Sequence, residues 1–154
     1  MREFLQSRLA DPLRTLLRQG VTPRELALCL ALGTALGLIP ILGVSTALCA
    51  LVALVLRLNM PAIQLVNYLL TPLQLVLIIP LLRFGEYLVG APRFPVTLES
   101  GLALLSQGVI DAIRILASAI AHATLGWLVV APLLAFALFR VLEPVLRHLR
   151  QGLR

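Results

Sequence analysis

The sequence predicts an all-α polytopic membrane protein in which proline and glycine break the membrane helices into halves. Of its 154 residues, 60% are hydrophobic and 13% are charged, whereas a soluble domain carries about 25% charged residues. The mean hydropathy is +0.99. Nearly every residue between 26 and 82 is apolar, but the run is cut at Pro40, Gly43, Pro61 and Pro72. The pieces hold roughly 9–14 residues, and a helix that spans a bilayer needs about 20.

The first piece has a strong helix-start signal. Thr22 and Glu25 form a capping box, and Pro23 occupies the first helical position between them. The break after this helix predicts a broken helical hairpin over 23–56. The hairpin either enters and leaves on one side of the membrane, as a re-entrant hairpin, or makes two short tilted spans.

A small-residue face lies on the first helix of this hairpin, at Gly33 and Gly37. Small residues four apart allow another helix to approach closely. The face therefore predicts tight packing within the chain or, alternatively, a seam between copies. Because a chain this short has few spans, we expect a homo-oligomer formed through the Gly33/Gly37 face.

The remaining elements follow from the proline, charge and apolar patterns. We expect, in chain order, a cytoplasmic interfacial helix at 1–20, a Pro-broken span at 61–82, a loop at 84–97, an amphipathic helix at 98–122, a span at 124–141 and an amphipathic basic tail at 142–154. Thr71 is expected to cap the second half of the broken span, and Trp127 to anchor the last span at the interface. By length, the chain is one membrane domain.

The charge pattern predicts the location of the protein. All 13 basic residues are arginines, and they concentrate towards the two ends of the chain. Cytoplasmic segments carry an excess of basic residues, so both termini are expected in the cytoplasm of a bacterial inner membrane and the number of crossings is expected to be even. The net charge of +6 flanks membrane segments, which favours anionic lipid over nucleic acid as a partner.

The first candidate site consists of two expected half-helix starts, at Ser45 and Thr71. A helix N-terminus exposes unpaired N–H groups and a partial positive charge, so at membrane depth it attracts an anion. Two starts facing one cavity would hold a phosphate-sized group. Thr46, Asn59 and Asn67 are expected to add hydrogen bonds, and Arg57 and Arg83 are expected at the far ends of the same two half-helices. The alternative is that Ser45, Asn59 and Thr71 only cap helices.

The second candidate site is a polar stripe on the helix expected at 98–122. At 100° per residue, six polar side chains fall within an arc of about 80°, namely Ser100, Gln107, Asp111, Arg114, Ser118 and His122. Asp111 and Arg114 are three residues apart and can pair. Three interpretations stay open: the helix lies flat in the outer interface, it lines a polar cavity, or it forms a polar seam between subunits.

Enzyme chemistry finds no support in the sequence. No nucleophile elbow surrounds the serines, and His122 and His148 lack partners at metal-ligand spacing. Cys29 and Cys49 lie inside apolar pieces, where cysteine behaves as a small buried hydrophobe. We therefore expect a protein that is not an enzyme and that holds neither a metal nor a cofactor.

Four short motifs resemble a family of small bacterial inner-membrane proteins known only as a domain of unknown function. They are an A-x-G-x-x-x-G helix at 31–37, a P-x-x-G break at 40–43, an L-R-x-N end at 56–59 and an N…T-P pattern at 67–72. The likeness covers residues 20–90, and Asn67 stands further from the Thr-Pro pair than in the family pattern. Some relatives look to be joined to glycosyltransferase domains that use lipid carriers. The resemblance therefore implies a membrane setting and a glycosyltransferase as a partner.

These features together predict a membrane protein that handles an anionic lipid or a lipid-linked precursor. It would act as a translocase, a scramblase or an accessory subunit of envelope biogenesis. The alternatives are a scaffold that anchors a partner enzyme without transport and a small solute or ion channel. A translocase should depend on Ser45, Thr71 and Asp111, whereas a scaffold should tolerate their loss.

Overall fold

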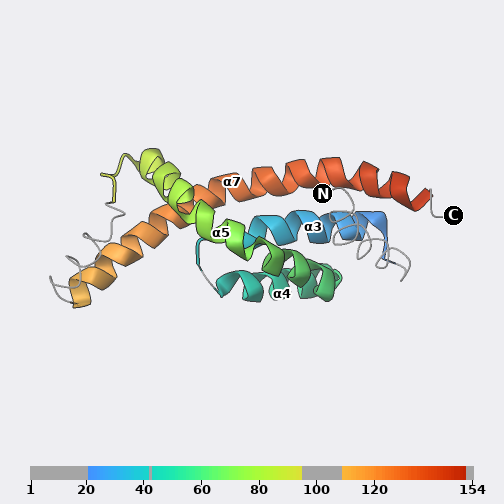
Figure 1. Ribbon diagram of the computed structural model, residues 1–154, viewed down its shortest axis with the longest axis horizontal. Helices are drawn as coiled ribbons and strands as arrows, with labels where there is room; N and C mark the ends of the chain where they lie inside the picture. The colour runs from blue at the N-terminus through green and yellow to red at the C-terminus, as the bar shows by residue number, and fades with distance from the viewer. Residues whose placement is uncertain (1–20, 42, 95–108, 152–154) are drawn as a thin grey trace.

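The computed structural model describes residues 21–41, 43–94 and 109–151. Within these residues the chain forms four helices and no strand: α3 (Pro23–Gly37), α4 (Val44–Leu56), α5 (Met60–Val89) and α7 (Val109–Gln151). α3 and α4 form a short hairpin beside the two long helices α5 and α7, which cross each other (Figure 1). The interfacial helix expected at 1–20 lies outside the described residues.

The two long helices, α5 and α7, are long and apolar enough to cross a membrane. Many of their large apolar side chains face outward, and Leu69, Val76 and Leu133 are more than half exposed. Hydrocarbon covers such a surface, and helices satisfy their own backbone within it. The prediction of an all-α membrane protein is confirmed.

The first helices of the chain, α3 and α4, are much shorter. They hold 15 and 13 residues, which corresponds to lengths of about 22 and 20 Å. A hydrocarbon core is about 30 Å thick, so neither helix is long enough to cross it without tilt or thinning. The break between them lies level with the middle of α5, because Gly37 contacts Asn67 and Ile39 binds Gln74.

The capping box at the start of α3 is confirmed. The Thr22 amide donates to Oε2 of Glu25 at 2.8 Å, and the Glu25 amide donates to the Thr22 hydroxyl at 3.2 Å. Pro23 occupies the first turn. The bond from the Thr22 amide lowers the pKa of the Glu25 carboxyl, so this side chain stays ionised at neutral pH.

The C-terminal half of the chain differs from the expected segments. The loop expected at 84–97 begins later, because α5 continues to Val89 and ends with Gly90 in the left-handed region. From Val109 on, the helix expected to end at 122, the span expected at 124–141 and the tail as far as Gln151 form one helix, α7, while residues 98–108 lie outside the described residues. Pro132 and Pro144 lie inside this helix. A proline removes only one backbone hydrogen bond, so it kinks a long helix without ending it where packing holds both sides.

The small-residue face of α3 is covered by α5 of the same chain. A Cβ at Gly33 would lie 3.1 Å from the backbone oxygen of Ile63, and a Cβ at Gly37 would lie 3.3 Å from Cα of Asn67. This face therefore packs within the chain, as the first of its two interpretations predicted. Self-association stays a prediction, but in this fold it requires a surface other than Gly33/Gly37.

The core of the hairpin is built from small and medium apolar side chains. Cys29 and Cys49 are fully buried in it and are free thiols, as expected for small buried hydrophobes. α5 and α7 cross outside this core. At the crossing, Gly85 lies against the backbone of His122, and Gly126 lies against the backbone of Leu81. Glycine allows two helix backbones to touch at such a crossing.

Candidate functional site

The start of α4 is not where the sequence indicated. Gly43 occupies the N-cap position with φ = 84° and provides no capping side chain. Ser45 lies inside the first turn and is 5% exposed. The prediction that Ser45 caps this helix is wrong, because glycine adopts the left-handed turn and the helix begins directly after it.

The half-helix start expected at Thr71 is also wrong. α5 runs without interruption through Pro72 and Pro80. The Thr71 hydroxyl donates to the backbone oxygen of Asn67, one turn earlier, at 3.4 Å. Serine and threonine hydroxyls commonly satisfy backbone groups around a proline in a membrane helix. Ser45 and Thr71 therefore do not present two helix N-termini to an anion.

A partly buried group of polar side chains joins α4 to α5 instead. We call it the amide cluster: Thr46, Gln64 and Asn67. Nε2 of Gln64 donates to the backbone oxygen of Thr46 at 3.0 Å. Nδ2 of Asn67 donates to the Thr46 hydroxyl at 3.2 Å and to Oε1 of Gln64 at 3.3 Å. These bonds fix the direction of both amides, and they leave Oδ1 of Asn67, which is buried, without a donor.

Two further side chains hold the end of α3. Nε2 of Gln74, a buried residue, donates to the backbone oxygen of Ile39 at 2.7 Å. The Trp127 indole donates to the backbone oxygen of Ala35 at 2.7 Å. Trp127 thus binds α3 within the protein, which corrects the expectation of an interfacial anchor.

Sequence reasoning missed Gln64 and Gln74. A signal was available, because Gln64, Asn67, Thr71 and Gln74 follow one another at spacings of three, four and three residues. Such spacing places polar groups on one face of a helix. A polar face on an apolar membrane helix points to the protein interior or to a cavity.

Asn59 and Arg57 lie at the other end of α4. Oδ1 of Asn59 accepts from the Ala62 amide at 2.9 Å, so this side chain caps α5. Arg57 is exposed and takes the left-handed conformation that ends α4, with φ = 53°. The capping interpretation of Asn59 is confirmed, and neither residue belongs to the amide cluster.

The polar stripe is described only in part. Ser100 and Gln107, together with the side chain of Asp111, lie outside the described residues. Arg114 is exposed, and the exposed Ser118 donates its hydroxyl to the backbone oxygen of Ile115. His122 is half-buried against α5. The described members thus range from exposed to half-buried, and the three interpretations of the stripe stay predictions.

Glu86, near the end of α5, is a buried charged residue that sequence reasoning had assigned to a loop. Its Oε2 accepts from Nη1 of Arg83 at 2.9 Å, and its Oε1 accepts from the Phe94 amide at 2.7 Å. Arg83 therefore lies within α5, paired one turn from Glu86, and not at the end of a half-helix.

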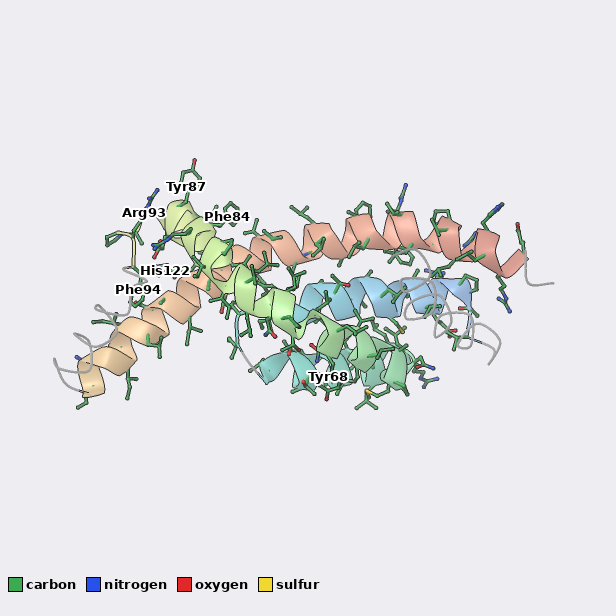
Figure 2. All side chains as sticks on the ribbon, in the orientation of Figure 1. Tyr68, Phe84, Tyr87, Arg93, Phe94 and His122 are labelled. Atoms are coloured by element: carbon green, nitrogen blue, oxygen red, sulfur yellow. The ribbon has the colours of Figure 1, made fainter. Side chains whose placement is uncertain are left out.

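Figure 2 shows the aromatic and basic side chains that gather at this end of α5: Phe84, Tyr87, Arg93, Phe94 and His122. Glu86 ties the segment that follows α5 back onto the helix.

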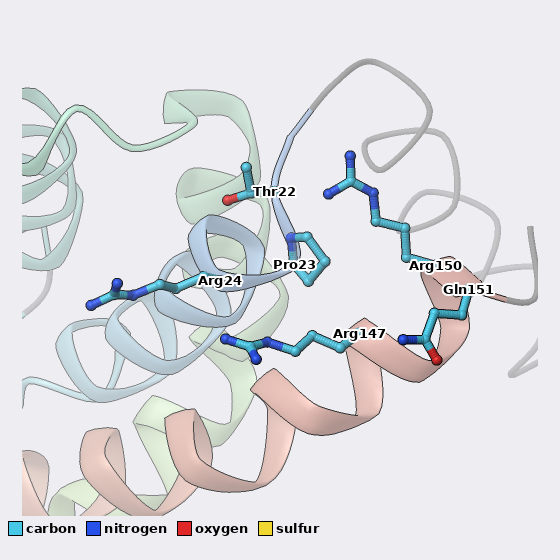
Figure 3. Close-up of a pocket in the computed structure, with 6 residues that line it drawn as sticks. All are labelled: Thr22, Pro23, Arg24, Arg147, Arg150 and Gln151. Atoms are coloured by element: carbon cyan, nitrogen blue, oxygen red, sulfur yellow. The ribbon is translucent and has the colours of Figure 1, made fainter. Parts of the chain in front are cut away.

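The opposite end of the molecule carries a pocket of about 350 Å³ between the start of α3 and the end of α7. We call it the arginine pocket. Figure 3 shows Arg147 extending from α7 towards α3, with Arg24 and Arg150 on either side of the helix start. Its lining residues are Thr22, Pro23, Arg24, Arg147, Arg150 and Gln151. Segments more than a hundred residues apart in the sequence thus form one basic site.

The charges around the arginine pocket are partly compensated. Arg147 pairs with Glu143 one turn earlier on α7. Glu25 is held by its capping bonds to Thr22. Among the residues that the structure describes, Arg24 and Arg150 have no carboxylate partner. The pocket is therefore positive, and it opens at the ends of the membrane helices.

Comparison with known proteins identifies the family. A family model described as "Uncharacterized protein conserved in bacteria (DUF2062)" matches residues 6–152. The chain belongs to this family. The match includes all four described helices, the amide cluster and the arginine pocket, so the resemblance expected over 20–90 extends to nearly the whole chain. No curated protein and no solved structure matches it.

Proposed function

We propose that the protein binds an anionic lipid or a lipid-linked precursor at the arginine pocket, as part of its translocation or of envelope biogenesis. The observation that carries the proposal is the meeting of Arg24, Arg147 and Arg150 around one pocket at the ends of apolar helices. Guanidinium groups bind phosphate with charge-assisted hydrogen bonds. Basic pockets at the ends of membrane helices are typical sites for phosphate-bearing headgroups.

The surroundings favour a lipid over a soluble anion. Val145 and Leu149, on the same stretch of α7 as Arg147, are exposed apolar residues. A bound lipid would place its phosphate among the arginines and its acyl chains against such side chains. This location replaces the pair of helix starts expected at Ser45 and Thr71, because α5 runs through Thr71 without a start.

The arrangement of the helices supports a membrane topology with both termini in the cytoplasm. The start of α3 and the end of α7 meet at the arginine pocket, and a re-entrant α3–α4 hairpin followed by α5 and α7 gives two crossings. Reporter fusions at the N-terminus and at the C-terminus should both give a cytoplasmic signal in a bacterial inner membrane. A periplasmic signal at either end contradicts this topology.

Lipid retention tests the function. The purified protein should retain phosphate-bearing anionic lipid in preference to zwitterionic lipid, as measured by native mass spectrometry. Replacing Arg24 and Arg150 together with glutamine should lower the affinity for anionic lipid by roughly thirtyfold, because each of the two lost charges near the membrane surface is worth about 1 kcal/mol. The helices should stay folded, since both side chains are at the protein surface.

A matched control is available in Arg57→Gln, which removes one exposed arginine that lies outside the pocket. This variant should retain lipid as the wild type does. Equal retention of anionic and zwitterionic lipid by the wild type would reject lipid binding and favour the scaffold alternative. A loss caused by Arg57→Gln but not by the pocket variant would place the site at the end of α4.

A further inference from the structure

The amide cluster contains one buried side-chain oxygen without a hydrogen-bond donor. Asn67 is 2% exposed, and its Oδ1 has no partner. A buried acceptor without a donor costs about 1–3 kcal/mol. Native proteins rarely keep such an atom unless water, an ion or a ligand satisfies it.

Exchanging the positions of Oδ1 and Nδ2 in the Asn67 amide does not give this oxygen a suitable donor. Gln64 donates its Nε2 to the backbone oxygen of Thr46, so it presents Oε1 to Asn67. Reversal of Asn67 would place two amide oxygens against each other. The network of the amide cluster therefore fixes Oδ1 on the side of Asn67 that faces α3.

The atom faces the C-terminal end of α3. Gly37, the last residue of that helix, lies against Asn67, and a Cβ at this position would be 3.2 Å from Oδ1. A helix C-terminus carries a partial negative charge, which persists here although the backbone oxygens of Ala35 and Ile39 already accept from Trp127 and Gln74. Oδ1 and the negative end of α3 thus converge at a break in the middle of the fold.

We propose that this convergence, between Oδ1 of Asn67 and the end of α3, binds a sodium ion. Carbonyl oxygens at the ends of broken helices coordinate such ions in transporters with discontinuous helices. The side chains of the amide cluster are all neutral, whereas calcium and magnesium sites use carboxylates. A monovalent cation therefore fits the site better than a divalent one. The proposal is independent of lipid binding at the arginine pocket.

The test measures thermal stability and sodium binding in the purified protein. At equal ionic strength, sodium chloride should raise the Tm above its value in choline chloride, because a ligand that binds the folded state stabilises it. Radioactive sodium should bind saturably. Asn67→Leu should lower the sodium affinity by at least about tenfold, since the ligand oxygen is lost. Asn67→Asp keeps the shape and adds a charge, so sodium should stabilise this variant more than it stabilises the wild type.

Asn59→Asp serves as the matched control, because it makes the same change on the same helix while aspartate still caps α5. Its response to sodium should equal that of the wild type. Identical Tm values for the wild type in sodium and choline, without saturable binding, would overturn the proposal and assign Oδ1 to a buried water. An equal gain in sodium response for both Asp variants would also overturn it. Arg24→Gln with Arg150→Gln should leave sodium binding intact, which separates this site from the lipid site.

Discussion

Replacing Gly85 with alanine is expected to separate α5 from α7 and to destabilise the protein by about 3 kcal/mol or more, at the upper end for overpacking. A Cβ at Gly85 would overlap the backbone carbonyl of His122, and one at Gly126 would overlap that of Leu81. Both obstacles are backbone atoms, so no change of side-chain rotamer relieves the clash. The Tm of the purified variant and its yield in the membrane measure the effect.

Gly90→Ala is the matched control for this substitution. Gly90 has φ = 66° and no atom within 4 Å of a Cβ built on it. Alanine at this position should lower the stability by only about 1–2 kcal/mol, the energy needed to hold it in the left-handed conformation. A Gly85→Ala variant that is no less stable than Gly90→Ala would show that the two helix backbones do not touch at this crossing.

The parts of the fold that follow from local sequence were predictable. Thr22, Pro23 and Glu25 satisfy the first turn of α3 from within four residues, so their pattern identifies a helix start without tertiary information. Asn59 at the start of α5 is a similar case. In both places the side chain and the backbone it satisfies are three residues apart.

The parts that depend on distant contacts were not predictable. Thr71-Pro72 has the sequence of a helix start, yet α5 continues because packing against α3 and α7 holds both sides of the proline. Trp127 has the composition of an interfacial anchor, and only the fold brings its indole to Ala35, 92 residues away. Local propensity is a weak prior wherever tertiary contacts decide.

The residues around the candidate site differ from those that the sequence indicated. The sequence indicated an anion site, and basic residues at the chain ends, as separate features. The structure places Arg24, Arg147 and Arg150 around one pocket, an arrangement that no pattern within one helix contains. Asn67 was expected as a minor hydrogen-bonding neighbour, and its importance depends on Thr46 and Gln64, which lie on two helices.

A second large effect is expected at Glu86, where replacement by alanine should destabilise the protein by about 2–3 kcal/mol. The carboxylate is almost fully buried, and its removal leaves the Phe94 amide without an acceptor and Arg83 without its counter-ion. Removing one partner of a fully buried pair costs about 3–5 kcal/mol. The Arg83 side chain is 35% exposed, so water recovers part of that cost.

Glu143→Ala provides the comparison, because it removes a glutamate from an ion pair of the same kind at the surface. The Arg147 side chain in that pair is 64% exposed, and an exposed pair contributes under about 1 kcal/mol. We therefore expect a clear fall in Tm for Glu86→Ala and almost none for Glu143→Ala. Glu86→Gln should fall between them, since the amide oxygen still accepts from Phe94 while the charge opposite Arg83 is lost. If Glu86→Ala were as stable as Glu143→Ala, this carboxylate would not hold the segment after α5. The low exposure of Glu86 would then not reflect a contribution to stability.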